Sequence, residues 1–212
     1  MTKPFTPRCQ QTSSTENQFR RKKKKSFLSK AKKFGKSGRF GKGREIDKDT
    51  YDYFLRILEQ IPSLFDTKSP EDPPEETEED RRIFVDNVFA TTEGEESSYC
   101  GNQLVSRVLE KLLPFASDQV VKRFMTSLAD DLRRVATDPF ASHVLQLLLT
   151  MSTFQAPSKE ATEVSSALDF RRTWVLRVSK FLINNMDEFA GDPYACHLLR
   201  TAFQVTDSIL FC

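Results

Sequence analysis

Three short segments of the chain carry the same kinds of polar side chain at the same spacing. Each has a small polar residue, an Arg or His directly after it, and a longer polar side chain four residues after the first: Ser106/Arg107/Glu110, Ser142/His143/Gln146 and Cys196/His197/Arg200. On a helix, the first and third members lie one turn apart, with the middle one alongside. Two such side chains can reach the edge of a base while Arg or His lies flat against it, which suits recognition of single-stranded RNA.

Each triplet belongs to a longer repeated segment. The segment DPFASHVLQLLL (138–149) resembles DPYACHLLRTAF (192–203), and NQLVSRVLEKLL (102–113) is a more diverged copy. The triplets are 36 and 54 residues apart, and a polar insert at 152–164 accounts for the longer gap. Each copy follows another amphipathic stretch, the clear cases being 118–132 and 170–186. Two helices per repeat predict an α-solenoid, in which each repeat buries its apolar face only against its neighbours.

The apolar residues of a repeat fall on one helical face. In the second copy, four apolar residues have helical spacing: Ala141, Val144, Leu145 and Leu148. The polar triplet of this copy lies outside that apolar face. Asp138 before Pro139 is typical of an N-cap followed by proline at the first helical position, and Asp192–Pro193 repeats the pattern. We therefore predict an all-α repeat domain over 81–212, interrupted only by loops at 93–98 and 152–164.

The pattern D-P-F/Y-A-S/C-H-x-L-Q/R resembles the pumilio repeat, in which one helix presents two edge-reading residues and one stacking residue to a single RNA base. The segments YFLRILEQI, NVF…EGEE and NQLVSRVLEKLL, with the acidic linker between the first two, further resemble the nucleolar pumilio-like proteins of the nucleolar protein nine type. The resemblance covers about 51–203. It implies a protein that acts in the assembly of the small ribosomal subunit.

The resemblance also implies what each triplet would read. Ser106 and Glu110 are similar to a guanine-reading pair, because a carboxylate can accept both donors of guanine's pairing edge. Ser142 and Gln146 are similar to an adenine-reading pair, whereas the pair in the third copy implies no particular base. RNA would run antiparallel to the order of the repeats.

Charge divides the rest of the chain into three parts. Residues 1–44 hold 15 Lys and Arg and a single acid, interrupted by Gly, and are predicted to be a disordered basic arm. Residues 45–65 contain a lead-in helix over 50–61 that ends at Pro62, and 66–80 form an acidic, Pro-rich loop with eight acids and one Lys. The net charge of +2 is therefore a cancellation between the arm and the remainder.

The arm is interpreted as a nuclear or nucleolar targeting segment, or as an RNA-binding patch. The alternative is a solvated tail without a role. The residues concerned are Arg20, Arg21, Lys22, Lys23, Lys24, Lys25, Lys30, Lys32 and Lys33.

Composition excludes several other classes of protein. The chain lacks the roughly 18 consecutive apolar residues of a membrane-spanning helix and the apolar run of a secretory signal. Four cysteines without CxxC spacing indicate neither a zinc site nor a disulfide framework, and fit a reducing compartment. His143 and His197 have no partnering Cys/His cluster that could complete a metal site. We expect a monomeric non-enzyme with no cofactor, metal or membrane partner.

We therefore expect a nucleolar protein that binds single-stranded pre-rRNA, with pre-ribosomal proteins and a nuclear import receptor as further partners. Two alternatives stay open: a helical-repeat scaffold for proteins with a nuclear import arm, and a cytoplasmic pumilio-type regulator of mRNA. Pumilio solenoids normally have eight repeats, and the final SILFC has the apolar residues of a helix that expects a further neighbour. We expect an N-terminal fragment whose RNA affinity is below that of a whole protein.

Overall fold

Helices make up nearly all of the described structure, and they recur in groups of three. The computed structural model describes residues 39–65, 78–152 and 162–210, all within one compact unit, Ser37–Cys212. Each group, here called a repeat, has a long first helix, a short second helix and a long third helix. Repeat 1 consists of α3 (Glu78–Ala90), α4 (Glu96–Cys100) and α5 (Gln103–Leu112). Repeat 2 consists of α6 (Asp118–Ala129), α7 (Leu132–Thr137) and α8 (Ala141–Met151). Repeat 3 consists of α9 (Thr162–Asn184), α10 (Met186–Phe189) and α11 (Ala195–Leu210).

Four further elements of the described residues lie outside the three repeats. The helix α2 (Lys48–Phe65) precedes repeat 1 and follows two short antiparallel strands, β1 (Arg39–Phe40) and β2 (Ile46–Asp47). In this pair, Arg39 lies opposite Asp47 and Phe40 opposite Ile46. A 3-10 turn, Leu113–Phe115, follows α5.

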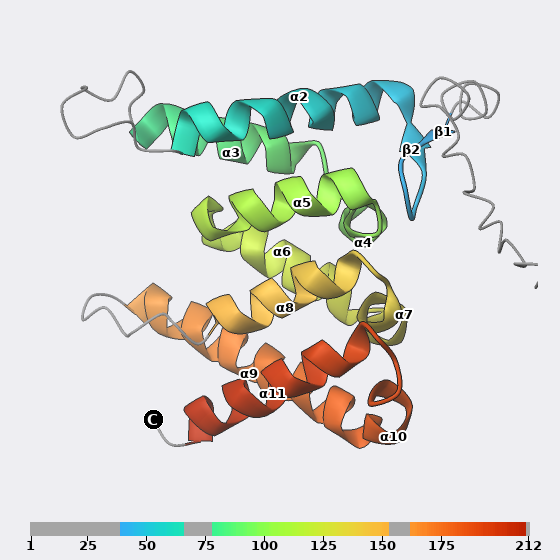
Figure 1. Cartoon of the computed structure of the whole chain (residues 1–212). Coiled ribbons are helices and arrows are strands. Elements are labelled where there is room, and N and C mark those ends of the chain that lie inside the picture. The colour runs from blue at the N-terminus through green and yellow to red at the C-terminus, as the bar shows by residue number, and fades with distance from the viewer. Residues whose placement is uncertain (1–38, 66–77, 153–161, 211–212) are drawn as a thin grey trace, which may run out of the picture. The chain divides into compact units, whose positions relative to one another are not determined.

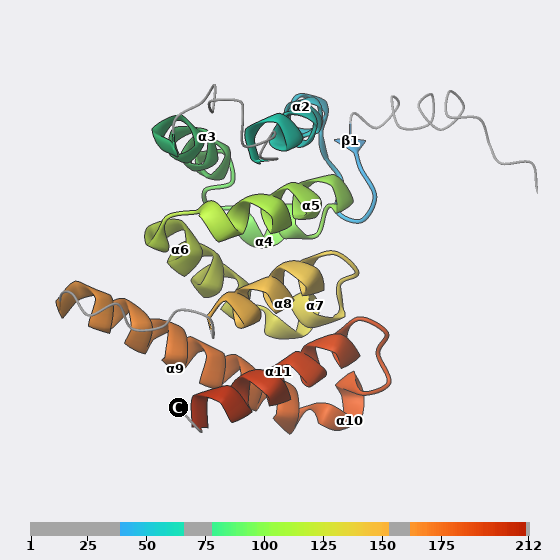
Figure 2. The ribbon, with the colours of Figure 1, turned by 60° about the vertical axis from the view of Figure 1, so that its left-hand side comes forward.

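The third helices lie side by side in one row, and α2 extends the row at its N-terminal end (Figure 1). In this row α2 packs against α5, α5 against α8, and α8 against α11. Figure 2 shows the first helices as a separate layer. There α6 packs against α9, and Phe89 of α3 meets Phe124 of α6 edge to face at 5.4 Å between ring centroids. The all-α solenoid is confirmed, and the four apolar residues predicted to face the core in α8 are buried.

The four helices of the row begin with the same side-chain cap. The carboxylate of Asp138 accepts the backbone N–H groups two and three residues later at 2.8 and 2.9 Å, and Asp192 does so at 2.8 Å for both. Asn102 caps α5 in the same way at 2.9 and 3.3 Å, and Asp47 accepts one such N–H at the start of α2 at 2.9 Å. Because these N–H groups have no partner within the helix, the cap fixes where each helix begins.

A buried ion pair joins repeat 2 to repeat 1. Arg123 of α6 donates from its guanidinium to the carbonyl of Phe89 at 2.6 Å, and its Nε lies 2.7 Å from Oε1 of Glu96. The side chain of Glu96 is only 4% exposed, whereas that of Arg123 is 27% exposed. The acid therefore depends on Arg123 to offset the loss of water around its charge.

Repeat 3 is joined to repeat 2 in the same layer. Arg171 of α9, which is buried, forms an ion pair with Asp118 of α6. One turn further along α9, the indole Nε1 of Trp174 donates to the Met125 carbonyl at 2.6 Å. The first helices of repeats 2 and 3 therefore each contact the repeat before them.

The lead-in helix does not end where the sequence analysis placed its end. It continues through Pro62 to Phe65, although proline cannot donate the hydrogen bond expected at that position. Ile61 and Leu64 continue the buried stripe begun by Phe54. Burial of this stripe against α5 outweighs the cost of the proline, a tertiary effect that local propensity does not contain.

Residues 39–44, which the sequence analysis assigned to the basic arm, are part of the folded unit. The backbone N–H of Arg44 donates to the Gly101 carbonyl at 2.8 Å, and the fully buried Asn102 donates from its side-chain amide to the Arg44 carbonyl at 2.7 Å. Gly43 has a φ of +86°, and a Cβ there would lie 2.3 Å from the Gly101 oxygen. The predicted arm over 1–38 lies outside the described residues.

Other corrections concern short elements. Helix α3 begins inside the predicted acidic loop 66–80, α4 begins inside the predicted loop 93–98, and α9 begins inside the predicted insert 152–164. The predicted two-helix repeats each contain an additional short helix. Helices of four to six residues span fewer than two turns, so their sequences show no periodic pattern.

The ion pair between Arg123 and Glu96 yields a test of stability. We expect Arg123→Met to lower the free energy of unfolding by about 3 kcal/mol, because a buried carboxylate is left without its partner. The double variant Arg123→Met/Glu96→Gln should recover part of this loss, as measured by urea denaturation. Equal losses in the single and double variants would contradict the assigned role of Glu96.

Candidate RNA-reading row

All nine triplet residues predicted from the sequence lie on the third helices, at equivalent places after the caps. The middle residues Arg107, His143 and His197 are exposed, as a stacking role requires. Of the third members, Arg200 is exposed and both Glu110 and Gln146 are half-buried. The structure thus brings three stacking candidates and three long polar side chains to one row of adjacent helices.

The first members of the triplets are less accessible than expected. Ser106 is 2% and Ser142 4% exposed, whereas Cys196 is half-buried. The hydroxyl of Ser106 donates to the Gln103 carbonyl at 3.3 Å within its own helix. The expectation that Ser142 lies off the buried face is wrong: α8 packs against both α5 and α11, and Ser142 is buried.

The pKa of the Glu110 carboxyl group is affected by side chains of two repeats. Burial raises its pKa above the ordinary value, and interactions with His143 of α8 and with Arg107 of its own helix oppose this rise. An acid of one repeat therefore interacts with the exposed histidine of the next. The same carboxylate is the expected acceptor for the donors of guanine.

The side chain of Gln146 also contacts the next repeat. Its Nε2 donates to the hydroxyl oxygen of Thr201 in α11 at 3.0 Å, and Thr201 is 5% exposed. That hydroxyl donates in turn to the carbonyl of His197 at 3.1 Å. The sequence analysis did not identify Thr201 as part of the site, because it lies one residue beyond the recurring triplet.

Helix α2 has the same register as the third helices, which the sequence analysis missed. The positions four, five and eight residues after its cap, Asp47, hold Tyr51, Asp52 and Leu55. Leu55, 39% exposed, cannot form hydrogen bonds, and the Tyr51 ring packs against Phe40 with centroids 5.9 Å apart. α2 therefore extends the row without the long polar third member that the other three helices carry. The capping residue at the same offset was the signal that could have identified it.

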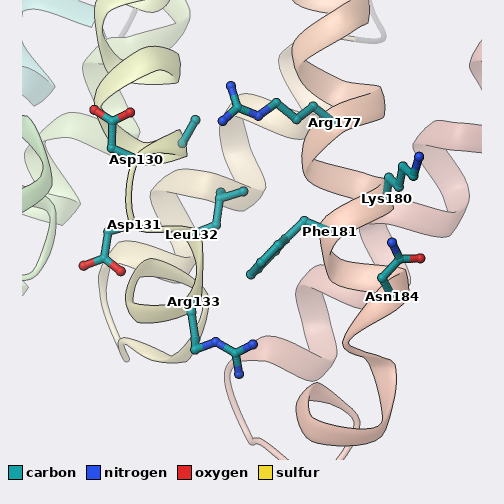
Figure 3. A pocket seen from close by; sticks show the side chains of 9 residues that line it. Asp130, Asp131, Leu132, Arg133, Arg177, Lys180, Phe181 and Asn184 are labelled. Atoms are coloured by element: carbon teal, nitrogen blue, oxygen red, sulfur yellow. The ribbon is translucent and has the colours of Figure 1, made fainter.

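A groove of about 490 Å³ lies on the other layer, between the turn that joins α6 to α7 and the outer face of α9. Figure 3 shows the Phe181 ring pointing from α9 toward Leu132 of α7. Around it, Arg133 pairs with Glu188 of α10, and Asp131 pairs with Arg134 of its own helix. Two charged residues of the groove, Arg133 and Asp131, thus have ion-pair partners beside the seam between repeats 2 and 3.

Metal binding and membrane insertion can be considered for residues 39–65, 78–152 and 162–210. Within these ranges, no group of three His, Cys, Asp or Glu side chains is placed to hold a metal ion. None of the helices in this part of the chain combines the length and the apolar character needed to span a membrane. The nine basic residues assigned to targeting, 20–25 and 30–33, lie outside the described residues.

A row of capped third helices that carry one polar triplet per repeat defines a pumilio-type solenoid. The family model described as the NOP9-like PUF repeat domain matches residues 94–209. The chain belongs to this family.

Relatives and solved structures agree with this assignment. The chain is 25% identical over 173 residues to Nucleolar protein 9 of Candida glabrata, covering 77% of this chain and 25% of the relative, and 33% identical over 72 residues to Nucleolar protein 9 of Schizosaccharomyces pombe, covering 34% and 11%. It therefore spans a quarter or less of these relatives' length. A solved structure of APUM23 with GGAGUUGACGG matches with a TM-score of 0.54 and 23% identity, covering 77% of this chain and 28% of APUM23. At this identity, the match concerns the fold.

The raised pKa of Glu110 has a consequence for stability. A carboxyl group whose pKa is higher in the folded than in the unfolded protein favours folding below its unfolded pKa, about 4.3, and this contribution is lost as pH rises through the folded pKa. We expect Glu110→Gln to be more stable than the parent at pH 7.5, with the difference closing as the pH falls toward 4. Urea denaturation of both proteins over this range measures it. A stability difference between the two proteins that does not change with pH would contradict a raised pKa of Glu110.

Proposed function

We propose that the chain binds single-stranded RNA along the row α5–α8–α11, one base per repeat. The observation that carries the proposal is the recurrence of a cap and a polar triplet at the same place on three mutually packed helices. A solenoid needs no such triplet to fold, because its stability comes from the apolar faces. Repeats that read one base each with two or three side chains are an established mode of RNA recognition.

Within each repeat, the three positions have different roles. Arg107, His143 and His197 are exposed and stack on bases or between them. Because Ser106 and Ser142 are nearly buried, discrimination between bases falls mainly to the third members of the triplets. A carboxylate at Glu110 favours guanine, and the carboxamide of Gln146 favours adenine.

The basic N-terminal residues supply attraction of a different kind. With 15 Lys and Arg against one acid over 1–44, this segment attracts phosphate without regard to sequence. Such contacts raise affinity and the rate of association, whereas base contacts provide selectivity. The affinity for RNA should therefore fall steeply as the salt concentration rises, whereas the preference for particular bases should stay the same.

We further propose that the protein acts in the nucleolus on pre-rRNA during assembly of the small ribosomal subunit. The relatives named Nucleolar protein 9 support this location. The processing step and the protein partners, including an import receptor that would bind the basic segment, belong to the proposal. The match to the NOP9-like PUF repeat domain supports a role as a binder of RNA rather than as an enzyme.

A single substitution tests base reading. We expect Gln146→Ala to weaken binding by about 1–3 kcal/mol for RNA with adenine at one position, by analogy with DNA base contacts, and to relax the preference there. Fluorescence anisotropy with RNAs that carry each of the four bases at each position measures both effects. Gln119→Ala, an exposed residue of α6 in the other layer, is the matched control and should change neither. Equal effects of the two variants, or no base preference in the parent, would contradict the proposal.

The targeting role is tested separately. A fluorescent reporter fused to residues 1–44 should concentrate in nucleoli, and replacement of residues 20–25 by alanine should return it to the cytoplasm, because the longest basic run is lost. Fluorescence microscopy with a nucleolar marker measures this. Replacement of the two basic residues 39 and 44 is the control. A reporter that stays cytoplasmic with the intact segment would favour a cytoplasmic RNA-binding protein.

A further inference from the structure

The orientation of a glutamine carboxamide decides what it offers to a ligand. The group has an oxygen that accepts and an NH₂ that donates, and a half-turn about its last bond exchanges them. A freely turning Gln146 could therefore accept from the amine of adenine or donate to a carbonyl of uracil. Selectivity requires something that holds the group in one orientation.

The hydroxyl of Thr201 supplies that constraint. It has one proton, which it donates to the carbonyl of His197 at 3.1 Å, four residues earlier in α11. Its oxygen can then only accept from Gln146, 3.0 Å away. Because an acceptor faces Gln146, the NH₂ end of the carboxamide is drawn toward α11 and the carbonyl oxygen Oε1 is left for a ligand. The hydrogen bond from Thr201 to the His197 carbonyl thus fixes the direction of the hydrogen bond between Gln146 and Thr201.

Burial makes the constraint effective. Thr201 is only 5% exposed, so water competes weakly for its oxygen, and Gln146 is itself half-buried. Turning the carboxamide over would place two acceptor oxygens against each other in a site largely closed to water. The net cost of losing a hydrogen bond of this kind corresponds to about a fivefold change in an equilibrium constant.

The feature is particular to this pair of repeats. Thr201 lies nine residues after its cap, Asp192, and the equivalent residue of repeat 2 is Leu147, which offers no hydrogen bond. A hydroxyl at this position is therefore not required for the helices to pack. Its presence beside Gln146, and its absence from the equivalent place in α8, indicate a role in reading rather than in folding.

We propose that Thr201 is a positioning residue for base selectivity: it holds Gln146 so that repeat 2 accepts a base with an exocyclic amine, adenine, and rejects uracil. The inference rests on the proposed RNA binding. It assigns part of the specificity of repeat 2 to a residue of repeat 3, so that the base read by one repeat depends on its neighbour.

The experiment compares three variants of the full chain. Thr201→Val removes the hydroxyl at nearly constant volume, Thr201→Ser retains it, and Thr206→Val is the matched control, since Thr206 donates to its own helix at Ala202 but has no contact with Gln146. Anisotropy titrations use two RNAs that differ only in adenine or uracil at the position affected by Gln146→Ala. We expect the ratio of the two dissociation constants to fall about fivefold in Thr201→Val and to be retained in the other two variants.

A second measurement makes the result independent of RNA affinity. In the free protein, the side-chain NH₂ protons of Gln146 should exchange slowly with water in the parent and in Thr201→Ser, and faster in Thr201→Val, as followed by NMR. An unchanged adenine-to-uracil ratio in Thr201→Val would overturn the inference while RNA binding stands. A parent that binds no RNA would overturn the proposed function, and unchanged exchange in Thr201→Val would show that Thr201 does not hold Gln146.

Discussion

A helix such as α8, flanked by α5 on one side and α11 on the other and backed by the first helices, has one narrow strip left where polar residues are tolerated. The remaining positions are apolar, and the largest of them are fully buried. This restriction accounts for the recurrence of the triplets, because only a few positions per helix can hold a side chain that meets a ligand. It also accounts for the near-complete burial of Ser106 and Ser142, which lie at the edge of the strip and remain only because they are small.

How far the sequence predicts this structure depends on the length of each signal. Asp138 and Asp192 mark their helices unambiguously, because a cap followed by proline admits few other conformations. The short helices between them leave no periodic signal, and continuation of α2 through Pro62 depends on burial against α5. The triplets could be found because they recur. Thr201 could not, because its role depends on a neighbouring helix and on where one hydroxyl proton goes.

The polar strip is not a set of independent positions. Glu110 of repeat 1 interacts with His143 of repeat 2, and Gln146 of repeat 2 bonds to Thr201 of repeat 3. Glu110 and Gln146 are therefore each affected by the helix that follows, Glu110 by charge and Gln146 by a hydrogen bond. Moving a single helix of this row into another solenoid would carry over the side chains without the environment that sets their protonation and orientation.

Asn102 illustrates how one amide can serve two parts of a chain. Its oxygen caps α5, as a carboxylate does in α8 and α11, but its nitrogen donates to the carbonyl of Arg44, which a carboxylate cannot do. Exchange of Asn102 for Asp would preserve the cap and remove the side-chain hydrogen bond to the preceding segment. The first turn of α5 and the attachment of residues 39–44 are thus thermodynamically linked. Tension or ligand binding that displaces residues 39–44 would be felt at the helix that carries Arg107 and Glu110.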